Sequence, residues 1–135
     1  MGFTAQITVR FNHVDAAGIV FYPRYYEMLN EVVERWLEER LGTSFRDLHL
    51  AQKIGLPARS IAVEFLKASR LGDRLTFGLK VEKAGRSSLT LDVVCSCADE
   101  VRMTAKMTLV CVSLAPLGAI PIPAALRERM AAFAA

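Results

Sequence analysis

The chain has 135 residues, 53% of them hydrophobic, and a formal net charge of +3 at pH 7. This length predicts a single domain over residues 1–135, and the high hydrophobic content predicts a homo-oligomer with apolar surface at its interface. The weak, scattered positive charge favours a small anionic ligand over a nucleic acid, and no apolar run reaches the roughly 18 residues of a membrane span.

The beginning of the chain, MGFTAQITVRF, lacks the charged and then apolar segments of a secretory signal. We therefore expect a cytoplasmic protein that does not associate with a membrane. The chain has three cysteines, Cys95, Cys97 and Cys111. An odd number of cysteines in a reducing compartment predicts core packing in place of disulfides.

A strand and a long helix are predicted in the first part of the chain. Residues 5–12 alternate between hydrophobic and polar side chains, which is typical of a half-buried strand. The hydrophobic face of this strand is formed by Ile7, Val9 and Phe11. A helix is predicted over residues 23–40, where hydrophobic residues recur at helical spacing opposite an acidic face. These residues are Tyr25, Met28, Leu29, Val32, Val33, Trp36 and Leu37. Pro23 suits the first turn of this helix and Gly42 its end.

The rest of the chain predicts mainly strands. Residues 43–57 are loop-like, with a short helix that Ser44 would cap. From residue 58 onward, hydrophobic residues recur at every second position in four runs. These runs cover residues 61–65, 75–81, 89–95 and 101–109. Short links containing Gly or Asp join them, so consecutive runs are predicted to pair as antiparallel neighbours. Residues 124–133 predict a terminal helix.

This order of elements defines the predicted fold class. One helix with a single strong hydrophobic stripe can be buried by a sheet that curls around it. We therefore predict an α+β fold in which an antiparallel five-stranded sheet wraps around one long central helix.

Missing motifs exclude several kinds of active site. The chain has no GxSxG, so it lacks the nucleophile elbow of α/β-hydrolases. It has neither GxxxxGK[ST] nor GxGxxG, and so no usual phosphate-binding loop. The only histidines are His13 and His49, and without HExxH or CxxC pairs we expect no metal site.

Asp15 is the residue that points most directly to chemistry. It lies among small and apolar residues immediately before the predicted helix. The N-terminus of a helix presents free N–H groups and partial positive charge, which can polarise a ligand carbonyl. A carboxylate facing such a carbonyl is a minimal hydrolytic site, acting as nucleophile or general base. The alternative is that Asp15 only orders the turn through an Asx-type hydrogen bond.

Residues 11–30, FNHVDAAGIVFYPRYYEMLN, resemble the signature of hotdog-fold acyl-CoA thioesterases of the 4-hydroxybenzoyl-CoA thioesterase type. The signature is roughly D-P-A-G-I-V-[WF]-[YF]-P-x-Y, and only Ala16 differs from it. Residues 65–75, FLKASRLGDRL, match another stretch common in these proteins. Together with the order of elements, the resemblance extends over nearly the whole chain.

The resemblance implies roles for particular residues. Asp15 falls on the catalytic carboxylate, and the backbone N–H of Tyr22 falls on the donor that polarises the thioester carbonyl. Gly18 would allow the tight turn and a close approach of the thioester. The family works as paired subunits, with the site at the dimer interface and the sheets joined edge to edge, which implies a homodimer or homotetramer. Coenzyme A enters only as part of the substrate, and no cofactor is implied.

Three departures from the family pattern concern the acyl group and the mechanism. Asn30 stands where the 4-hydroxybenzoyl enzyme has an Asp that binds the ring hydroxyl. Asn30 borders the hydrophobic stripe near Tyr26, so both are candidates to contact the substrate. His13 stands where that enzyme has another acid, and is a further candidate. The Tol–Pal-linked relatives have a His shortly after the Asp, which residues 20–22 lack.

Substrate contacts are also predicted on the strands. Coenzyme A carries phosphates, and the family contacts its nucleotide near the link VEKAGRSS, where Lys83, Arg86 and Ser87 are candidates. Arg59 and Ser60 begin the strand that is expected to line the acyl pocket. Arg59 is a further candidate to contact coenzyme A, and Ser60 is a candidate to contact the acyl group.

These observations predict a thioesterase that hydrolyses an aromatic, 4-hydroxybenzoyl-like, or short acyl-CoA to the free acid and coenzyme A. Two alternatives remain. One is a dehydratase of acyl thioesters, whose members usually carry a His on or just before the central helix that is missing here. The other is an acyl-CoA-binding protein without catalysis, which would not depend on Asp15.

Overall fold

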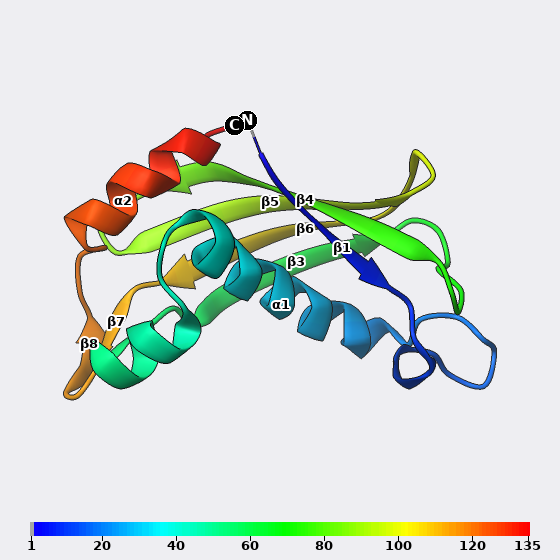
Figure 1. The fold of residues 1–135 in the computed structure, drawn as a ribbon, viewed down its shortest axis with the longest axis horizontal. Helices are drawn as coiled ribbons and strands as arrows, with labels where there is room; N and C mark the ends of the chain where they lie inside the picture. Colours follow the sequence, from blue (N-terminus) through cyan, green and yellow to red (C-terminus); the bar gives the residue numbers. More distant parts are fainter. Residues whose placement is uncertain (1) are drawn as a thin grey trace.

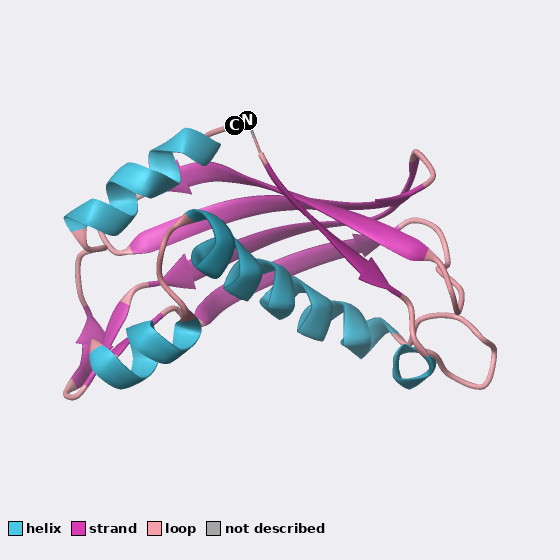
Figure 2. Ribbon diagram, viewed as in Figure 1, coloured by secondary structure: helices cyan, strands magenta, loops and turns pink. Residues whose placement is uncertain are grey.

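The computed structural model describes residues 2–135. A long helix lies across one face of an antiparallel sheet, and a shorter helix covers the sheet near the C-terminus (Figure 1; Figure 2). The helices are α1 (Tyr22–Arg40) and α2 (Ala124–Met130), with the short helical turns η1 (Phe11–His13), η2 (Asp47–Ala51) and η3 (Ala131–Phe133). The strands are β1 (Phe3–Thr8), β2 (Ile54–Gly55), β3 (Ala58–Phe65), β4 (Arg74–Ala84), β5 (Ser88–Cys97), β6 (Glu100–Val110), β7 (Val112–Leu114) and β8 (Leu117–Ala119).

The predicted helix and its buried face are confirmed. Helix α1 begins one residue earlier than predicted, at Tyr22. All seven residues of the predicted hydrophobic stripe are buried, and they face the sheet. Gly42 follows the end of α1 with a φ of +74°, a left-handed conformation that glycine adopts without strain. The predicted cap of the short helix is also present, since the Asp47 N–H donates to Ser44 Oγ at 3.0 Å.

The main sheet has the strand order β1-β4-β5-β6-β3, and a second sheet has the order β2-β7-β8. Every neighbouring pair in the main sheet is antiparallel. Alternate residues of β4, β5 and β6 are buried beneath α1, as the period-two pattern predicted. The α+β class, with an antiparallel sheet and a helix against it, is therefore confirmed. The second sheet was not predicted.

The predicted pairing of the first two runs after residue 58 is wrong. Strand β3 pairs with β6, and β4 pairs with β1 and β5. The link over residues 66–73 does not form a hairpin, because the N–H groups of Leu66 and Lys67 donate to the carbonyl of Arg102 on β6. The link then crosses the end of the sheet to reach β4 beside β1 (Figure 1).

The predicted strand over residues 5–12 is too long. Strand β1 ends at Thr8, and Phe11 lies in the turn η1 with 83% of its surface exposed. The Arg10 N–H donates to His13 Nδ1 at 2.8 Å, which stabilises this turn against further strand. Ile7 and Val9 are buried as predicted.

Strand β3 is an edge of the main sheet, and its side chains are largely exposed. At the C-terminus, Phe133 packs edge-on against Trp36 of α1 with ring centroids 5.6 Å apart. The predicted terminal helix is thus confirmed as α2 and η3, and it closes the core at the end of α1. The prediction of core packing is confirmed for Cys95 and Cys111, which are buried, while Cys97 is half-buried.

Candidate active site

The candidate site starts from a narrow hairpin loop that leads into α1. The Asp15 N–H donates to the Ile19 carbonyl at 3.0 Å, and the Phe21 N–H donates to the His13 carbonyl at 2.9 Å. Gly18 closes the tip of this loop with a φ of +78°, and a Cβ there would have no atom within 4 Å. Gly18 therefore supplies the left-handed conformation that the tight turn requires.

The Asp15 side chain is exposed and has one local hydrogen bond. Its Oδ1 accepts from the Ala17 N–H at 2.8 Å, so the Asx-type turn named above is present. Among residues 2–135, no basic side chain pairs with Asp15, and no donor reaches its Oδ2. The turn holds one carboxylate oxygen and leaves the other without a hydrogen bond from any described residue, so that this oxygen can take a proton or attack.

The N-terminus of α1 presents a free donor. The residue that precedes it, Phe21, makes no side-chain cap, and Pro23 has no N–H. The Arg24 N–H donates to the Phe21 carbonyl at 2.8 Å. In the described part of the chain no acceptor is found for the Tyr22 N–H. This N–H, at the positive end of α1, can donate to a ligand carbonyl.

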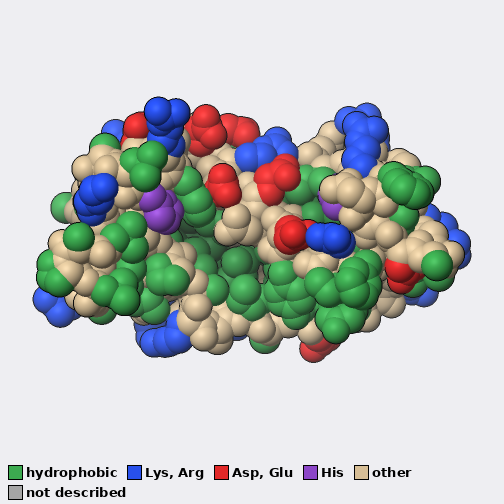
Figure 3. All heavy atoms as spheres, turned by 90° about the horizontal axis from the view of Figure 1, so that it is seen from below, with side chains coloured by type: hydrophobic (Ala, Val, Ile, Leu, Met, Phe, Trp, Pro, Cys, Tyr) green, Lys and Arg blue, Asp and Glu red, His purple; other side chains and the backbone are tan. Residues whose placement is uncertain are grey.

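A groove of about 200 Å³ runs between α1 and the edge of the sheet. Tyr26 and Asn30 line it from α1, and Ala58 and Ile61 line it from β3. Figure 3 shows a hollow on this side of the molecule, with hydrophobic side chains gathered around it. Two of the predicted acyl-group contacts thus share one groove, one and two helical turns after Tyr22.

The other predicted acyl-group contacts do not line this groove. Ser60 pairs with Thr108 on the face of the sheet away from α1, because a bulge between Ala58 and Ser60 shifts the alternation. Arg59 lies in that bulge and is exposed. His13 is half-buried at the base of the hairpin loop, where its Nδ1 accepts from the Arg10 N–H.

The predicted coenzyme A contacts lie at the opposite end of the sheet from Asp15. Lys83, Arg86 and Ser87 surround the turn between β4 and β5, beside α2, while the Asp15 loop contacts the link that precedes β4 (Figure 1). Strand β4 has 11 residues, so its ends are roughly 35 Å apart. One protomer does not bring the two groups of residues together.

Arg127 of α2 is a residue that the sequence gave no reason to single out. Its guanidinium donates to the carbonyls of Gly85 and Arg86 in the turn between β4 and β5, the latter at 3.0 Å. Arg129, two residues along the same helix, instead donates to the Leu41 carbonyl at 2.6 Å, at the end of α1. Helix α2 therefore holds the turn that carries Arg86 in place.

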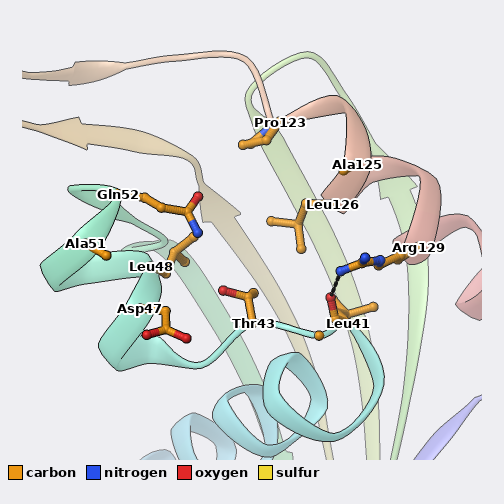
Figure 4. A pocket seen from close by; sticks show the side chains of 11 residues that line it. Leu41, Thr43, Asp47, Leu48, Ala51, Gln52, Pro123, Ala125, Leu126 and Arg129 are labelled. Atoms are coloured by element: carbon orange, nitrogen blue, oxygen red, sulfur yellow. Dashed lines mark hydrogen bonds between the residues drawn. The ribbon is translucent and has the colours of Figure 1, made fainter.

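A larger cavity of about 360 Å³ lies at the other end of α1 (Figure 4). Thr43, Asp47 and Gln52 face it from one side, and Leu126 and Arg129 of α2 from the other. None of the predicted site residues lines this cavity, so it is not the candidate active site.

The thiols of Cys95 and Cys111 are buried in the core. Burial raises the pKa of the Cys95 thiol to about 12 and also raises the pKa of Cys111. Both thiols are therefore protonated, and weak nucleophiles, at neutral pH. Among residues 2–135 no cluster of three or more His, Cys, Asp or Glu side chains is arranged to hold a metal ion. In the same residues, no helix has both the length and the hydropathy to cross a membrane.

Comparison with known proteins identifies the family to which this fold belongs. Residues 9–130 match the Thioesterase-like superfamily, and the chain belongs to that superfamily. A 1,4-dihydroxy-2-naphthoyl-CoA hydrolase from Synechocystis is 25% identical over 123 residues, which cover 90% of this chain and 88% of the relative. The hydrolase of the same name from Nostoc punctiforme is 29% identical over 112 residues, covering 83% of this chain and 75% of the relative. These matches confirm the prediction of a thioester hydrolase.

Solved structures agree with this family. The 1,4-dihydroxy-2-naphthoyl-CoA thioesterase from Synechocystis superposes with a TM-score of 0.88 at 23% identity, covering 97% of this chain and 96% of that one. A gentisyl-coenzyme A thioesterase superposes with a TM-score of 0.85 at 26% identity, covering 93% of this chain and 99% of that one. The fold is therefore that of the hotdog thioesterases.

Proposed function

We propose that this protein hydrolyses the coenzyme A thioester of a hydroxylated aromatic acid. The observation that carries the proposal is the free Tyr22 N–H at the start of α1, next to a hairpin loop whose Asp15 has one unengaged carboxylate oxygen. A thioester carbonyl that accepts from this N–H has its carbon exposed to attack. The partial charge at the helix N-terminus stabilises the oxyanion that then forms.

In the proposed mechanism, Asp15 works as a carboxylate. It attacks the carbonyl carbon directly, or it takes a proton from a water molecule that attacks. The tetrahedral intermediate places negative charge on the oxygen that faces the Tyr22 N–H. Its collapse breaks the carbon–sulfur bond and releases coenzyme A as a thiolate, which takes up the proton that water gives up. After direct attack by Asp15, the acyl group is left on the carboxylate as an anhydride, which water then hydrolyses to the acid. After attack by water, the acid forms in the same step.

The aromatic substrate class is supported by the relatives and by the groove. The similar proteins are named for the 1,4-dihydroxy-2-naphthoyl and gentisyl groups, which are both aromatic and hydroxylated. The groove beside α1 has an aromatic side chain, Tyr26, and an amide, Asn30, that can bond a ring hydroxyl. The 4-hydroxybenzoyl group remains a candidate within this class.

We further propose that two copies pair through the free edge of β3. This strand ends the main sheet, and its backbone groups on that side have no strand partner among residues 2–135. Pairing would also bring a second set of Lys83, Arg86 and Ser87 toward Asp15. If these residues bind the nucleotide, the separation along β4 requires that a partner subunit supply them.

The assay that tests the proposal measures thiol release from a panel of acyl-CoAs. The panel contains 1,4-dihydroxy-2-naphthoyl-, gentisyl-, 4-hydroxybenzoyl-, benzoyl- and short aliphatic acyl-CoAs. We expect turnover of a hydroxylated aromatic member and a loss of at least about 100-fold in Asp15→Ala. Saturable binding without turnover would instead identify an acyl-CoA-binding protein in which Asp15 only orders its turn. Turnover of aliphatic members alone would contradict the aromatic class.

A further inference from the structure

Within the part of the chain that the structure describes, the most deeply buried polar residue lies in the link over residues 66–73. Ser69 is 1% exposed, and no other polar or charged residue among residues 2–135 is buried to this degree. Its Oγ accepts hydrogen bonds from the Tyr25 hydroxyl at 2.8 Å and from Arg102 Nη1 at 3.2 Å. A buried hydroxyl that accepts two hydrogen bonds is held in one position.

Ser69 contacts both parts of the candidate active site. Its hydroxyl holds Tyr25, which lies in the first turn of α1, three residues after Tyr22. Its carbonyl accepts from the Val20 N–H at 2.8 Å. Val20 follows Ile19, whose carbonyl accepts from the Asp15 N–H. Ser69 is thus hydrogen-bonded both to the first turn of α1 and to the hairpin loop.

Arg102 holds Ser69 from the other side. Only 13% of the Arg102 side chain is exposed, and its Nη1 also donates to the Ala68 carbonyl at 3.0 Å and to Asp73 Oδ2 at 2.8 Å. The link is therefore anchored on β6 on both sides of Ser69. Burial raises the pKa of the Tyr25 phenol, so the hydroxyl stays protonated at neutral pH and keeps donating to Ser69.

We propose that Ser69 is a positioning residue for the reaction, which sets the Asp15 loop and the first turn of α1 at a fixed separation. The role rests on the proposed function, because it assumes that Asp15 and the Tyr22 N–H act on the same carbonyl. A shift of about 1 Å between reacting groups can lower a rate by about 100-fold. Ser69 touches no reacting atom, and its effect is on geometry alone.

The test compares kcat and KM in Ser69→Ala, Tyr25→Phe and the double variant, using the best acyl-CoA of the panel. Both single changes break the hydrogen bond between Tyr25 and Ser69 but keep the backbone bond from Val20. We expect kcat to fall by about 10-fold or more in each and KM to change by less than about twofold. The double variant should be no slower than the slower single variant, because both remove the same interaction.

Thr108→Val is the matched control. The Thr90 and Thr108 hydroxyls form another pair, with oxygens 3.4 Å apart, on the face of the sheet away from α1. Thr108→Val removes this pair of hydroxyls, and we expect it to leave kcat unchanged. Equal losses of kcat in Thr108→Val and Ser69→Ala would overturn the positioning role, as would wild-type kcat in both single variants.

The two proposals fail in different ways. If the wild-type protein hydrolyses no acyl-CoA, the proposed function fails and the positioning role fails with it. If the wild type turns over substrate and the variants match it, only the positioning role is wrong. Should Ser69→Ala not fold, Tyr25→Phe carries the same test, since it keeps the buried ring and loses only the hydroxyl.

Discussion

The Asn30 amide donates from Nδ2 to Oε1 of Glu34, one turn further along α1, at 2.9 Å. Because this bond uses one N–H and sets the orientation of the amide, Oδ1 is the atom left to accept from a ligand. Asn30 lines the groove beside α1, so a substrate hydroxyl that donates a hydrogen bond would suit this position.

This relationship predicts the effect of Asn30 and Glu34 on selectivity. We expect Asn30→Ala to reduce the ratio of kcat/KM for the best hydroxylated aryl-CoA over benzoyl-CoA by about 10-fold, the worth of one hydrogen bond. Glu34→Ala should reduce the same ratio less, because the amide remains but can rotate. Glu31→Ala is the control, since Glu31 pairs with Arg35. An unchanged ratio in Asn30→Ala would show that Asn30 does not bind the substrate hydroxyl.

The role of the Tyr22 N–H can be tested with proline. Tyr22→Pro removes the N–H, and proline is well accepted at the first position of a helix. Phe21 already has the extended conformation that a following proline requires, with φ −69° and ψ 121°. We expect kcat to fall by about 100-fold or more, as for other oxyanion donors. Tyr22→Ala keeps the N–H and should lose far less, so equal losses in the two variants would contradict the role.

The hydrogen bonds of Arg127 to the turn between β4 and β5 predict that replacing this residue affects only the binding of coenzyme A. Arg127→Met frees the turn that carries Arg86, so KM for the acyl-CoA should rise by about 10-fold while kcat changes little. The matching N-acetylcysteamine thioester, which lacks the nucleotide, should keep its KM. Arg129→Met is the control on the same helix, because Arg129 contacts the end of α1 and not this turn. A raised KM for both thioesters would show that the turn does not bind the nucleotide.

Asp73 predicts how stability depends on pH. The Arg70 N–H and then the Arg102 guanidinium lower the pKa of Asp73 below its ordinary value of 3.8. A carboxyl whose pKa is lower in the folded protein than in the unfolded chain stabilises the fold when the pH is above the unfolded value. This contribution is lost as the pH falls toward the lower pKa of the folded protein. In urea unfolding, Asp73→Asn should therefore be less stable than the wild type by a constant amount from pH 7 to about 5. The difference should shrink below about pH 4, and a difference that grows there would contradict the ion pair with Arg102.

Patterns of hydrophobic spacing predicted the local structure well. The stripe of α1 could be predicted because a single helix beneath a sheet buries one continuous face. Tyr26 and Asn30 border that stripe, which is why their place in a groove could be inferred. The same reasoning extended β1 too far to Phe11, because alternation does not reveal a backbone turn that His13 stabilises.

The sequence did not predict contacts between residues that are far apart along the chain. Ser69 and Tyr25 are 44 positions apart, and Ser69 and Arg102 are 33 apart. No local pattern in the sequence indicates that these side chains contact one another. The wrong pairing of β3 with β4 has the same origin, since the bonds from the link to Arg102 decide where the chain goes. Arg127 was missed because the turn it holds is more than 40 residues away.

The most direct test of the whole account is the rate of thiol release by Asp15→Asn with the best acyl-CoA of the panel. An Asn at this position keeps an oxygen that can accept from the Ala17 N–H, so the turn is preserved while the carboxylate is lost. We predict an unchanged free energy of unfolding and a loss of kcat of at least about 100-fold. A wild-type rate in this variant would contradict the account and leave Asp15 as a residue that only orders its turn.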